Sequence, residues 1–324
     1  MTSPDLPAEL KAALDARLKG FSRNEAAERA AAISKTYRDG GGSGAIRSEP
    51  DALAYALARM PATYAAVTAS LNALVHIRPD FAPKSLLDIG AGPGTASWAA
   101  AETFSSLQDF KLLDANDALR KLALDLVSES YRLRNIAYER GEARNSLIRA
   151  EAADFVIASY MIGEIAEAEQ KALAELMWEK TGDTLLAVEP GTPAGYARII
   201  ALRERLIAAG AHVAAPCPHD GKCPLVAPDW CHFTQRLRRS RAHKQVKGAE
   251  LPFEDEKFAY VALTRSAVVA RPSRLLAQPV VSKVEVTAKL CTPDGLVLAR
   301  IPRRAKTDYA VARRWRWGDA VMEP

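Results

Sequence analysis

The sequence lacks any apolar run near the roughly 20 residues that cross a bilayer, so we expect no membrane-spanning segment and no membrane partner. Residues 1–7 carry an acid where a signal or transit peptide would carry Arg or Lys, which predicts a cytoplasmic protein. Only four of the 324 residues are cysteines, and a reducing compartment disfavours disulfides between them. The remaining composition, 48% hydrophobic and 26% charged, is ordinary for a globular protein with a large core.

Three alternate glycines follow a short apolar run at residues 85–89. This pattern predicts a strand, a tight turn whose backbone can approach a ligand, and a helix that starts at Thr95. A second apolar run ends in Asp114, about twenty residues on, where an acid can accept both hydroxyls of a ribose. A turn that only closes a strand-helix corner is the alternative. The candidate cofactor residues of the turn are Asp88, Gly90, Gly92 and Gly94.

The Gly-x-Gly-x-x-Gly spacing of dinucleotide-binding folds is absent. The spacing instead resembles motif I of class I S-adenosylmethionine-dependent methyltransferases. That resemblance implies a glycine turn beneath the methionine part of S-adenosyl-L-methionine and Asp114 on its ribose. Further strands at 153–160 and 184–191 alternate with helices, as in a doubly wound sheet, and their ends at Ser159 and Glu189 should border the same crevice.

The fold class expected is α/β, a class I methyltransferase Rossmann-like doubly wound sheet with additions at both ends. Four glycines within residues 39–44 predict a mobile loop, and Pro61 predicts an interruption between two helices. The expected regions are an N-terminal helical region at 1–80, a core at 81–270 with a cysteine-loop insertion at 215–248, and a C-terminal β-hairpin with a basic tail at 271–324.

No catalytic residue is predicted. Amino-methylating enzymes of nucleic acids often carry Asn or Asp, two prolines and an aromatic residue after the fourth strand, whereas this chain reads Ser-Tyr-Met-Ile-Gly-Glu at 159–164. No cysteine lies near these strands in sequence to serve as the nucleophile of cytosine carbon methylation. Tyr160 or Glu164 could orient a target or act as a base, or could be structural.

All four cysteines lie after residue 216, three of them on one proline-containing loop. Four thiolates can complete a zinc site or hold an iron-sulfur cluster. The two-residue gaps of zinc ribbons are missing, so three ligands on one loop and a remote fourth look more like a cluster. Unrelated buried thiols are the plain alternative. The candidate metal ligands are Cys217, Cys223, Cys231 and Cys291.

A Cys-Pro-His-x-x-x-Cys-Pro loop at 217–224, followed by Trp-Cys-His-Phe at 230–233, joins this core and its helical N-terminal region. The combination is similar to the methyltransferase-like proteins associated with assembly of the small ribosomal subunit, found in bacteria and mitochondria. The similarity covers roughly residues 20–310. It implies a [4Fe-4S] cluster on the four cysteines, partners among small-subunit rRNA and ribosomal proteins, and a monomer when free. A cluster ligated by Cys291 would pin the C-terminal extension to the core.

Two basic stretches favour RNA over merely solvated charge. The first, at 236–247, holds six Lys or Arg and no acid, and the second, at 300–316, is interleaved with aromatic residues that can stack on unpaired bases. The leading interpretation is therefore an rRNA-binding assembly factor that supports translation. An active rRNA methyltransferase and a small-molecule methyltransferase with structural zinc are the alternatives. The RNA-binding candidates are Arg236, Arg238, Arg239, Arg241, Lys244, Lys247, Arg303, Arg304, Arg313, Arg314 and Arg316.

Overall fold

The computed structural model describes residues 1–19, 21–128, 130–133, 135–269 and 271–321. Its centre is an eight-stranded sheet in the order β3-β2-β1-β4-β5-β8-β6, with β7 paired to β8. Strands β1 to β5 run parallel, and β8 is antiparallel to its neighbours β5, β6 and β7. The strands are β1 (Ser85–Ile89), β2 (Asp109–Asp114), β3 (Ile136–Arg140), β4 (Ala153–Ser159), β5 (Thr181–Pro190), β6 (His212–Ala215), β7 (Phe233–Arg238) and β8 (Phe253–Thr264).

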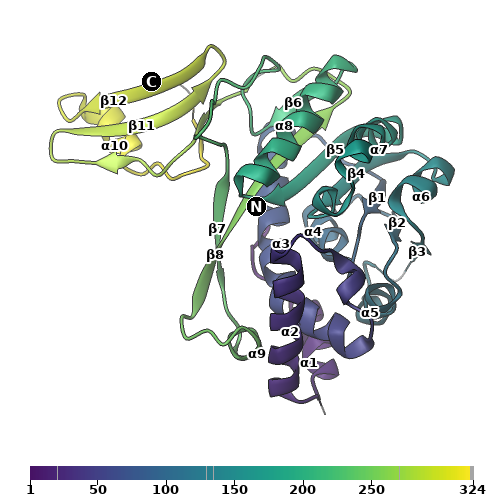
Figure 1. Ribbon diagram of the computed structural model, residues 1–324. Coiled ribbons are helices and arrows are strands. Elements are labelled where there is room, and N and C mark those ends of the chain that lie inside the picture. Colours follow the sequence, from purple (N-terminus) through teal and green to yellow (C-terminus); the bar gives the residue numbers. More distant parts are fainter. Residues whose placement is uncertain (20, 129, 134, 270, 322–324) are drawn as a thin grey trace.

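Helices cover both faces of this sheet (Figure 1). Successive residues of a strand point to opposite faces, so Leu86 belongs to the core beneath α3 (Glu49–Ile77), α4 and α5, while Leu87 belongs to the core beneath α6 to α8. The doubly wound α/β fold expected from the sequence is thereby confirmed. These helices are α4 (Thr95–Thr103), α5 (Asp117–Val127), α6 (Ala143–Arg149), α7 (Glu167–Glu179) and α8 (Pro193–Ala208).

The N-terminal region is helical, as expected, and consists of α1 (Ala8–Arg17), α2 (Arg23–Arg38) and α3 (Glu49–Ile77). The interruption expected at Pro61 is wrong, because Pro61 lies inside the single helix α3. A proline within a helix costs about 3 kcal/mol through its missing N–H and its ring. Burial of most of the α3 side chains against the core offsets that cost.

A second sheet forms a lobe, residues 273–321, which projects from the core (Figure 1). Its strand order is β10-β11-β9-β13, with β12 paired to β11 as the hairpin that the sequence predicts. Between β7 and β8, the short helix α9 (Arg241–Val246) packs against α2 and α3. The lobe consists of β9 (Ser273–Leu275), β10 (Val280–Val281), β11 (Glu285–Thr292), β12 (Gly295–Pro302), α10 (Lys306–Ala312) and β13 (Ala320–Val321).

No helix in the described part of the chain combines the length and apolarity that a bilayer crossing needs.

Candidate functional site

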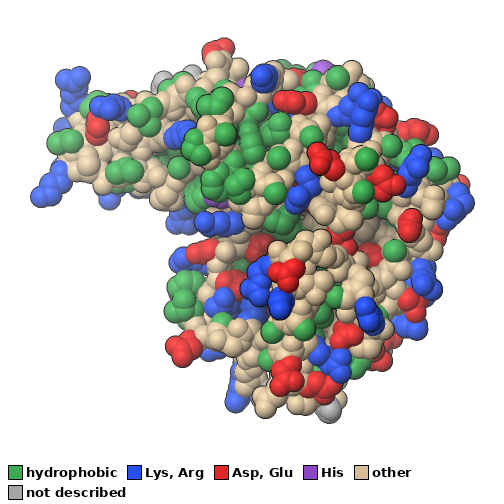
Figure 2. Space-filling model, in the orientation of Figure 1, with side chains coloured by type: hydrophobic (Ala, Val, Ile, Leu, Met, Phe, Trp, Pro, Cys, Tyr) green, Lys and Arg blue, Asp and Glu red, His purple; other side chains and the backbone are tan. Residues whose placement is uncertain are grey.

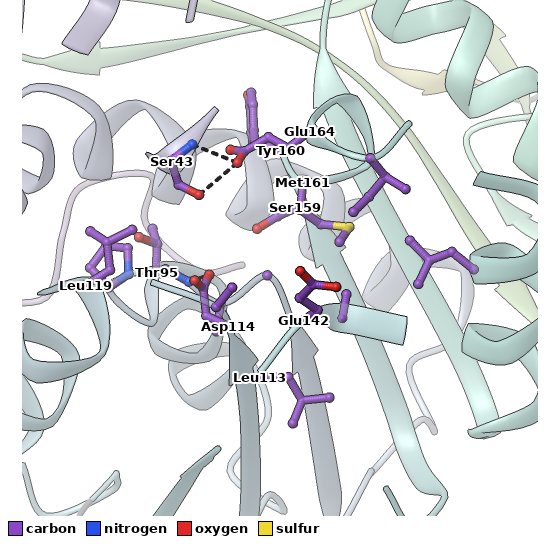
Figure 3. Close-up of a pocket in the computed structure, with 18 of the residues that line it drawn as sticks. Ser43, Thr95, Leu113, Asp114, Leu119, Glu142, Ser159, Tyr160, Met161 and Glu164 are labelled. Carbon is purple, nitrogen blue, oxygen red and sulfur yellow. Dashed lines mark hydrogen bonds between the residues drawn. The ribbon is translucent and has the colours of Figure 1, made fainter. Parts of the chain in front are cut away.

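A cavity of about 460 Å³ lies at the carboxyl ends of the parallel strands β1, β2 and β4 (Figure 3). Gly90, Gly92, Asp114 and Ser159, four of the residues predicted from the sequence, line it. This is the edge at which open α/β sheets bind their ligands. The N-terminal helical region closes the other side through Tyr37, Ser43, Tyr55, Met60 and Thr63.

The glycine turn has the backbone conformation that its sequence predicts. Gly90, Gly92 and Gly94 all have positive φ, at 65°, 53° and 79°. A Cβ at Gly90 would also lie 2.5 Å from the Cβ of Met161, a cavity-lining residue. Glycine is therefore required at residue 90 for both conformation and space.

Asp114 is fixed by backbone donors at the end of β2. Its Oδ2 accepts from the Gly92 N–H at 2.8 Å, and its Oδ1 accepts from the Asn116 N–H at 2.7 Å. Burial raises the pKa of this carboxyl, while the two backbone hydrogen bonds lower it. Each oxygen keeps a lone pair for a further donor, so the carboxylate can accept hydroxyls from a ligand in the cavity.

Asp88 and Glu189 do not line the cavity. The Oδ2 of Asp88 accepts from the N–H and hydroxyl of Ser97, at 3.1 and 2.7 Å, and burial raises the pKa of Asp88 to about 7. The fully buried Glu189 accepts from the Ile162 N–H at 3.1 Å and from the Nε of Arg198 at 2.6 Å. Both acids brace the segments that border the cavity.

The glycine-rich segment 39–44, where the sequence predicts a mobile loop, contributes Ser43 to the cavity wall. The N–H and hydroxyl of Ser43 donate to Glu164 Oε2 at 2.8 and 2.9 Å (Figure 3). The Tyr37 hydroxyl donates to Glu164 Oε1 at 3.1 Å. On the opposite side, Asn116 Nδ2 donates to the Ser43 carbonyl at 2.8 Å. This segment, with the short helix η1 (Ser43–Ala45), therefore bridges Glu164 and Asn116 as a lid.

Tyr160 and Glu164, the two residues named as possible bases, both form hydrogen bonds within the protein. Tyr160 has a φ of 56°, and its hydroxyl donates to Glu256 Oε1 at 2.9 Å; the same oxygen accepts from Arg59 at 3.1 Å. Burial raises the pKa of the Tyr160 phenol well above its usual value, so it is a poor base. The carboxylate of Glu164 accepts hydrogen bonds from Ser43 and Tyr37.

Sequence reasoning missed one side of the cavity. Glu142, Ala143, Arg144 and Asn145, which follow β3, all line it. Strand β3 has five residues at the edge of the sheet and no continuous apolar run, so its sequence carried little strand signal. Nothing in the sequence placed the lid residues at the cavity, because their hydrogen-bond partners lie far away along the chain.

All four cysteines line a second, small cavity of about 30 Å³ between α8, the cysteine loop and the lobe. The pKa values of the Cys217, Cys231 and Cys291 thiols are raised, mainly by burial and further by neighbouring cysteines, that of Cys291 to about 12. The Tyr196 hydroxyl lies 3.2 Å from the Sγ of Cys223. Within the described part of the chain, no three His, Cys, Asp or Glu side chains are arranged to hold a single metal ion.

Two buried arginines line the same cavity, Arg203 at 1% and Arg274 at 5% exposure. Arg203 donates to the carbonyls of His219 and Gly221 at 2.8 Å, and its Nε has no hydrogen-bond partner among the described residues. Neither arginine forms an ion pair with a described carboxylate. Uncompensated buried cations are costly, so this chamber favours a negatively charged centre.

Three of the six cations of the first basic stretch pair with two carboxylates of β8. Arg236 pairs with Asp255 at 2.8 Å, while Arg239 and Lys247 pair with Glu254 at 2.8 and 2.9 Å. Among the described residues, no carboxylate pairs with the other three candidates of this stretch. Those are Arg238, Arg241 and Lys244.

The second basic stretch lies on the lobe and keeps its charge. None of its candidate arginines pairs with a carboxylate of the described chain. Residues 271–324 hold 11 Lys or Arg and five Asp or Glu, whereas the whole chain has a net charge of only +5. Figure 2 shows Lys and Arg side chains at the projecting end of the lobe. The candidates here are Arg303, Arg304, Arg313, Arg314 and Arg316.

Comparison with known proteins places residues 49–322 in a match to the family described as mitochondrial small ribosomal subunit Rsm22. The human protein named ribosome assembly protein METTL17, mitochondrial, is 30% identical over 294 residues, which are 83% of this chain and 62% of that protein. The Schizosaccharomyces pombe protein named Rsm22-cox11 tandem protein 2, mitochondrial, is 26% identical over 84% of this chain and 43% of its own length. The chain thus spans less than two thirds of these relatives.

Solved structures with similar folds include two methyltransferases. Precorrin-6y C5,15-methyltransferase from Geobacter metallireducens has a TM-score of 0.40 and 13% identity over 60% of this chain and 84% of its own. Magnesium protoporphyrin IX methyltransferase from Synechocystis, with bound S-adenosylmethionine, has a TM-score of 0.40 and 13% identity over 72% of this chain and 90% of its own. Similarity at this level says nothing of substrate.

The expectation of a cytoplasmic protein is wrong. It depended on the acid near the amino terminus, whereas the matching family and the curated relatives all carry mitochondrial names. The charge pattern of residues 1–7 concerns only whether a signal or transit peptide can be recognised in those residues. It therefore could not decide the compartment.

Proposed function

The chain belongs to the family of the mitochondrial small ribosomal subunit protein Rsm22, and from that membership we propose that it assists assembly of a small ribosomal subunit by binding its rRNA. The human relative named as a ribosome assembly protein supports this proposal, as does the charge of the lobe. The observation that carries it is the group of lobe arginines that pair with no carboxylate of the described residues. Exposed guanidinium groups of this kind bind phosphates and release counterions from RNA.

Aromatic side chains lie on the same part of the lobe. Trp315 and Trp317 are half-buried and flank Arg316, and both line a groove of about 710 Å³ between the lobe and β7, β8 and α3. Indole rings beside guanidinium groups suit unpaired bases, which stack on aromatic faces while the cations hold the backbone. Single-stranded segments of rRNA are therefore the proposed target.

S-adenosyl-L-methionine is the proposed ligand of the larger cavity. The fit depends on the positive-φ turn at Gly90 and Gly92, which leaves the backbone open to the ligand, and on the fixed carboxylate of Asp114 for the ribose. Ser43 of the lid and Tyr37 of α2 would cover the bound molecule. When bound, this cofactor can supply a methyl group, while the protein residues bind it and exclude water.

A [4Fe-4S] cluster is the proposed occupant of the cysteine chamber, held by Cys217, Cys223, Cys231 and Cys291. Four thiols around one cavity provide the donor set, and the orphaned Nε of Arg203 beside them favours a negative centre. A cluster would cross-link the cysteine loop to β11 of the lobe and so support a rigid RNA-binding surface. Anaerobic purification with iron, sulfide and zinc analysis distinguishes a cluster from zinc.

Binding without methyl transfer is the proposed use of the cofactor. Tyr160 is committed to Glu256 and Glu164 to the lid, which leaves neither as a base for an acceptor. Incubation of the chain with labelled cofactor and small-subunit RNA tests this directly. Label that enters RNA in a single turnover would establish the alternative, an active rRNA methyltransferase.

The experiment that tests the function is a comparison of purified small-subunit and large-subunit rRNA from the same source. We expect the full chain to bind small-subunit rRNA at least tenfold more tightly at equal salt. Equal affinity for both RNAs would mean that the chain binds RNA only by non-specific electrostatic attraction, and would contradict the proposal.

A further inference from the structure

The outer edge of the lobe is a β-strand with one side unpaired. Strand β12 pairs with β11 over its whole length, and no other strand of the described chain pairs with β12. Figure 1 shows β12 at the top of the lobe, with β11 and α10 below it. An open strand edge of eight residues is a template for another strand.

The register identifies the groups that face outward. Thr292 and Gly295 flank a two-residue turn and form the first hydrogen-bonded pair of the hairpin, and bonded pairs then alternate along it. Leu296, Leu298 and Arg300 are consequently the residues whose N–H and C=O groups point away from β11. Within the described structure these three N–H and three C=O groups have no hydrogen-bond partner.

The side chains of this edge are apolar and exposed. Leu296, Val297 and Leu298 are 39%, 44% and 60% exposed, and the register with β11 continues without a bulge. Free edges are usually blocked by charges, prolines or bulges, none of which interrupts residues 296–299. A partner strand would cover both the backbone groups and the apolar side chains.

We propose that β12 accepts an extended segment of a partner protein, in which apolar residues alternate and a carboxylate lies opposite Arg300. The exposed Arg300 and the excess of Lys and Arg on the lobe provide the charge complementarity for such a segment. A second copy of this chain would bring two basic lobes together, which like-charge repulsion disfavours. RNA offers phosphates to the arginines but no strand to pair with β12. The inference is independent of RNA and cofactor binding.

The test uses the full chain and two synthetic peptides. The acidic probe is acetylated Thr-Val-Glu-Val-Thr-Val-Glu-Val, and the matched probe has Lys in place of each Glu. We expect the acidic peptide to bind about fivefold more tightly and to slow hydrogen exchange at the amides of Leu296, Leu298 and Arg300. No slowing, or equal binding of both peptides, overturns the proposal.

Three variants locate the binding. Leu298→Pro removes one outward N–H but no bond to β11, so we expect about tenfold weaker binding at an unchanged unfolding midpoint. Arg300→Glu should reverse the preference between the peptides, which keeps the test decisive if Leu298→Pro misfolds. Lys257→Glu, the same charge change on β8, should leave the preference intact. Protection of the same amides by self-association of the free chain, or by an RNA oligonucleotide alone, would instead identify a second copy or RNA as the occupant.

Discussion

The Sγ of Cys291 lies 3.6 Å from the Nε2 of His219, although 72 residues separate them along the chain. Cys291 belongs to β11 of the lobe, and His219 belongs to the cysteine loop of the core. This contact brings the fourth thiol to the cavity that the other three line. A metal centre in that cavity would therefore connect the lobe to the core.

Replacing Cys291 tests that connection. We expect Cys291→Ser, purified without air, to lose most of its iron and sulfide, because one of four ligands is missing. Hydrogen exchange in β11 should then quicken, since the lobe has lost its cross-link. His219→Gln is the matched control, because it alters the neighbour of Cys291 but no thiol. Full metal content in Cys291→Ser, or its loss in His219→Gln, would assign the ligands differently.

Asp114→Asn tests the cofactor cavity. An amide keeps one oxygen acceptor but not the charge, so we expect S-adenosyl-L-methionine to bind about 10 to 100-fold more weakly, as for loss of charged hydrogen bonds. Calorimetry of the folded variant measures this. Asp117→Asn, on the first turn of α5 and outside the cavity, should bind as the wild type does. Unchanged affinity in Asp114→Asn would show that Asp114 does not bind the ribose.

Glu164→Gln tests the lid. Glutamine retains one acceptor oxygen, whereas the two carboxylate oxygens of Glu164 now accept from Ser43 of the lid and from Tyr37 of α2. We expect the cofactor to dissociate several-fold faster because the lid opens more readily. Stopped-flow displacement measures the rate, with Glu167→Gln at the exposed start of α7 as control. Identical rates in both variants would mean that the segment does not gate the cavity.

His243 predicts a pH dependence of stability. It is 2% exposed in α9, with Glu254, Lys247 and Arg239 around it, and burial lowers its pKa to about 4. The unfolded chain therefore binds more protons than the folded chain between pH 6.5 and 4. As the pH is lowered through this range, the free energy of unfolding decreases, by at most about 1.4 kcal/mol per pH unit. Urea unfolding at pH 7.5, 6 and 5 should show this dependence reduced in His243→Phe. An equal dependence in both proteins would contradict it.

The sequence was most informative where local chemistry decides the structure. The apolar run before Gly90 and the one before Asp114 each needed burial on both faces and a turn, and both are strands in the expected place. Other features depend on distant partners. The acids of β8 that neutralise Arg236 and Arg239, and the Glu164 that holds Ser43, become visible only with cross-strand register and helix packing. Pro61 misled because tertiary burial outweighed a local preference.

The most direct test of the account is the salt dependence of rRNA binding by the lobe. The variant with Arg303, Arg304, Arg313 and Arg314 all changed to Gln is compared with wild type and with Arg236→Gln, whose arginine is already paired with Asp255. We predict that the slope of log affinity against log salt falls by about three in the quadruple variant and stays unchanged in Arg236→Gln. A quadruple variant with wild-type slope and affinity would contradict rRNA binding through the lobe.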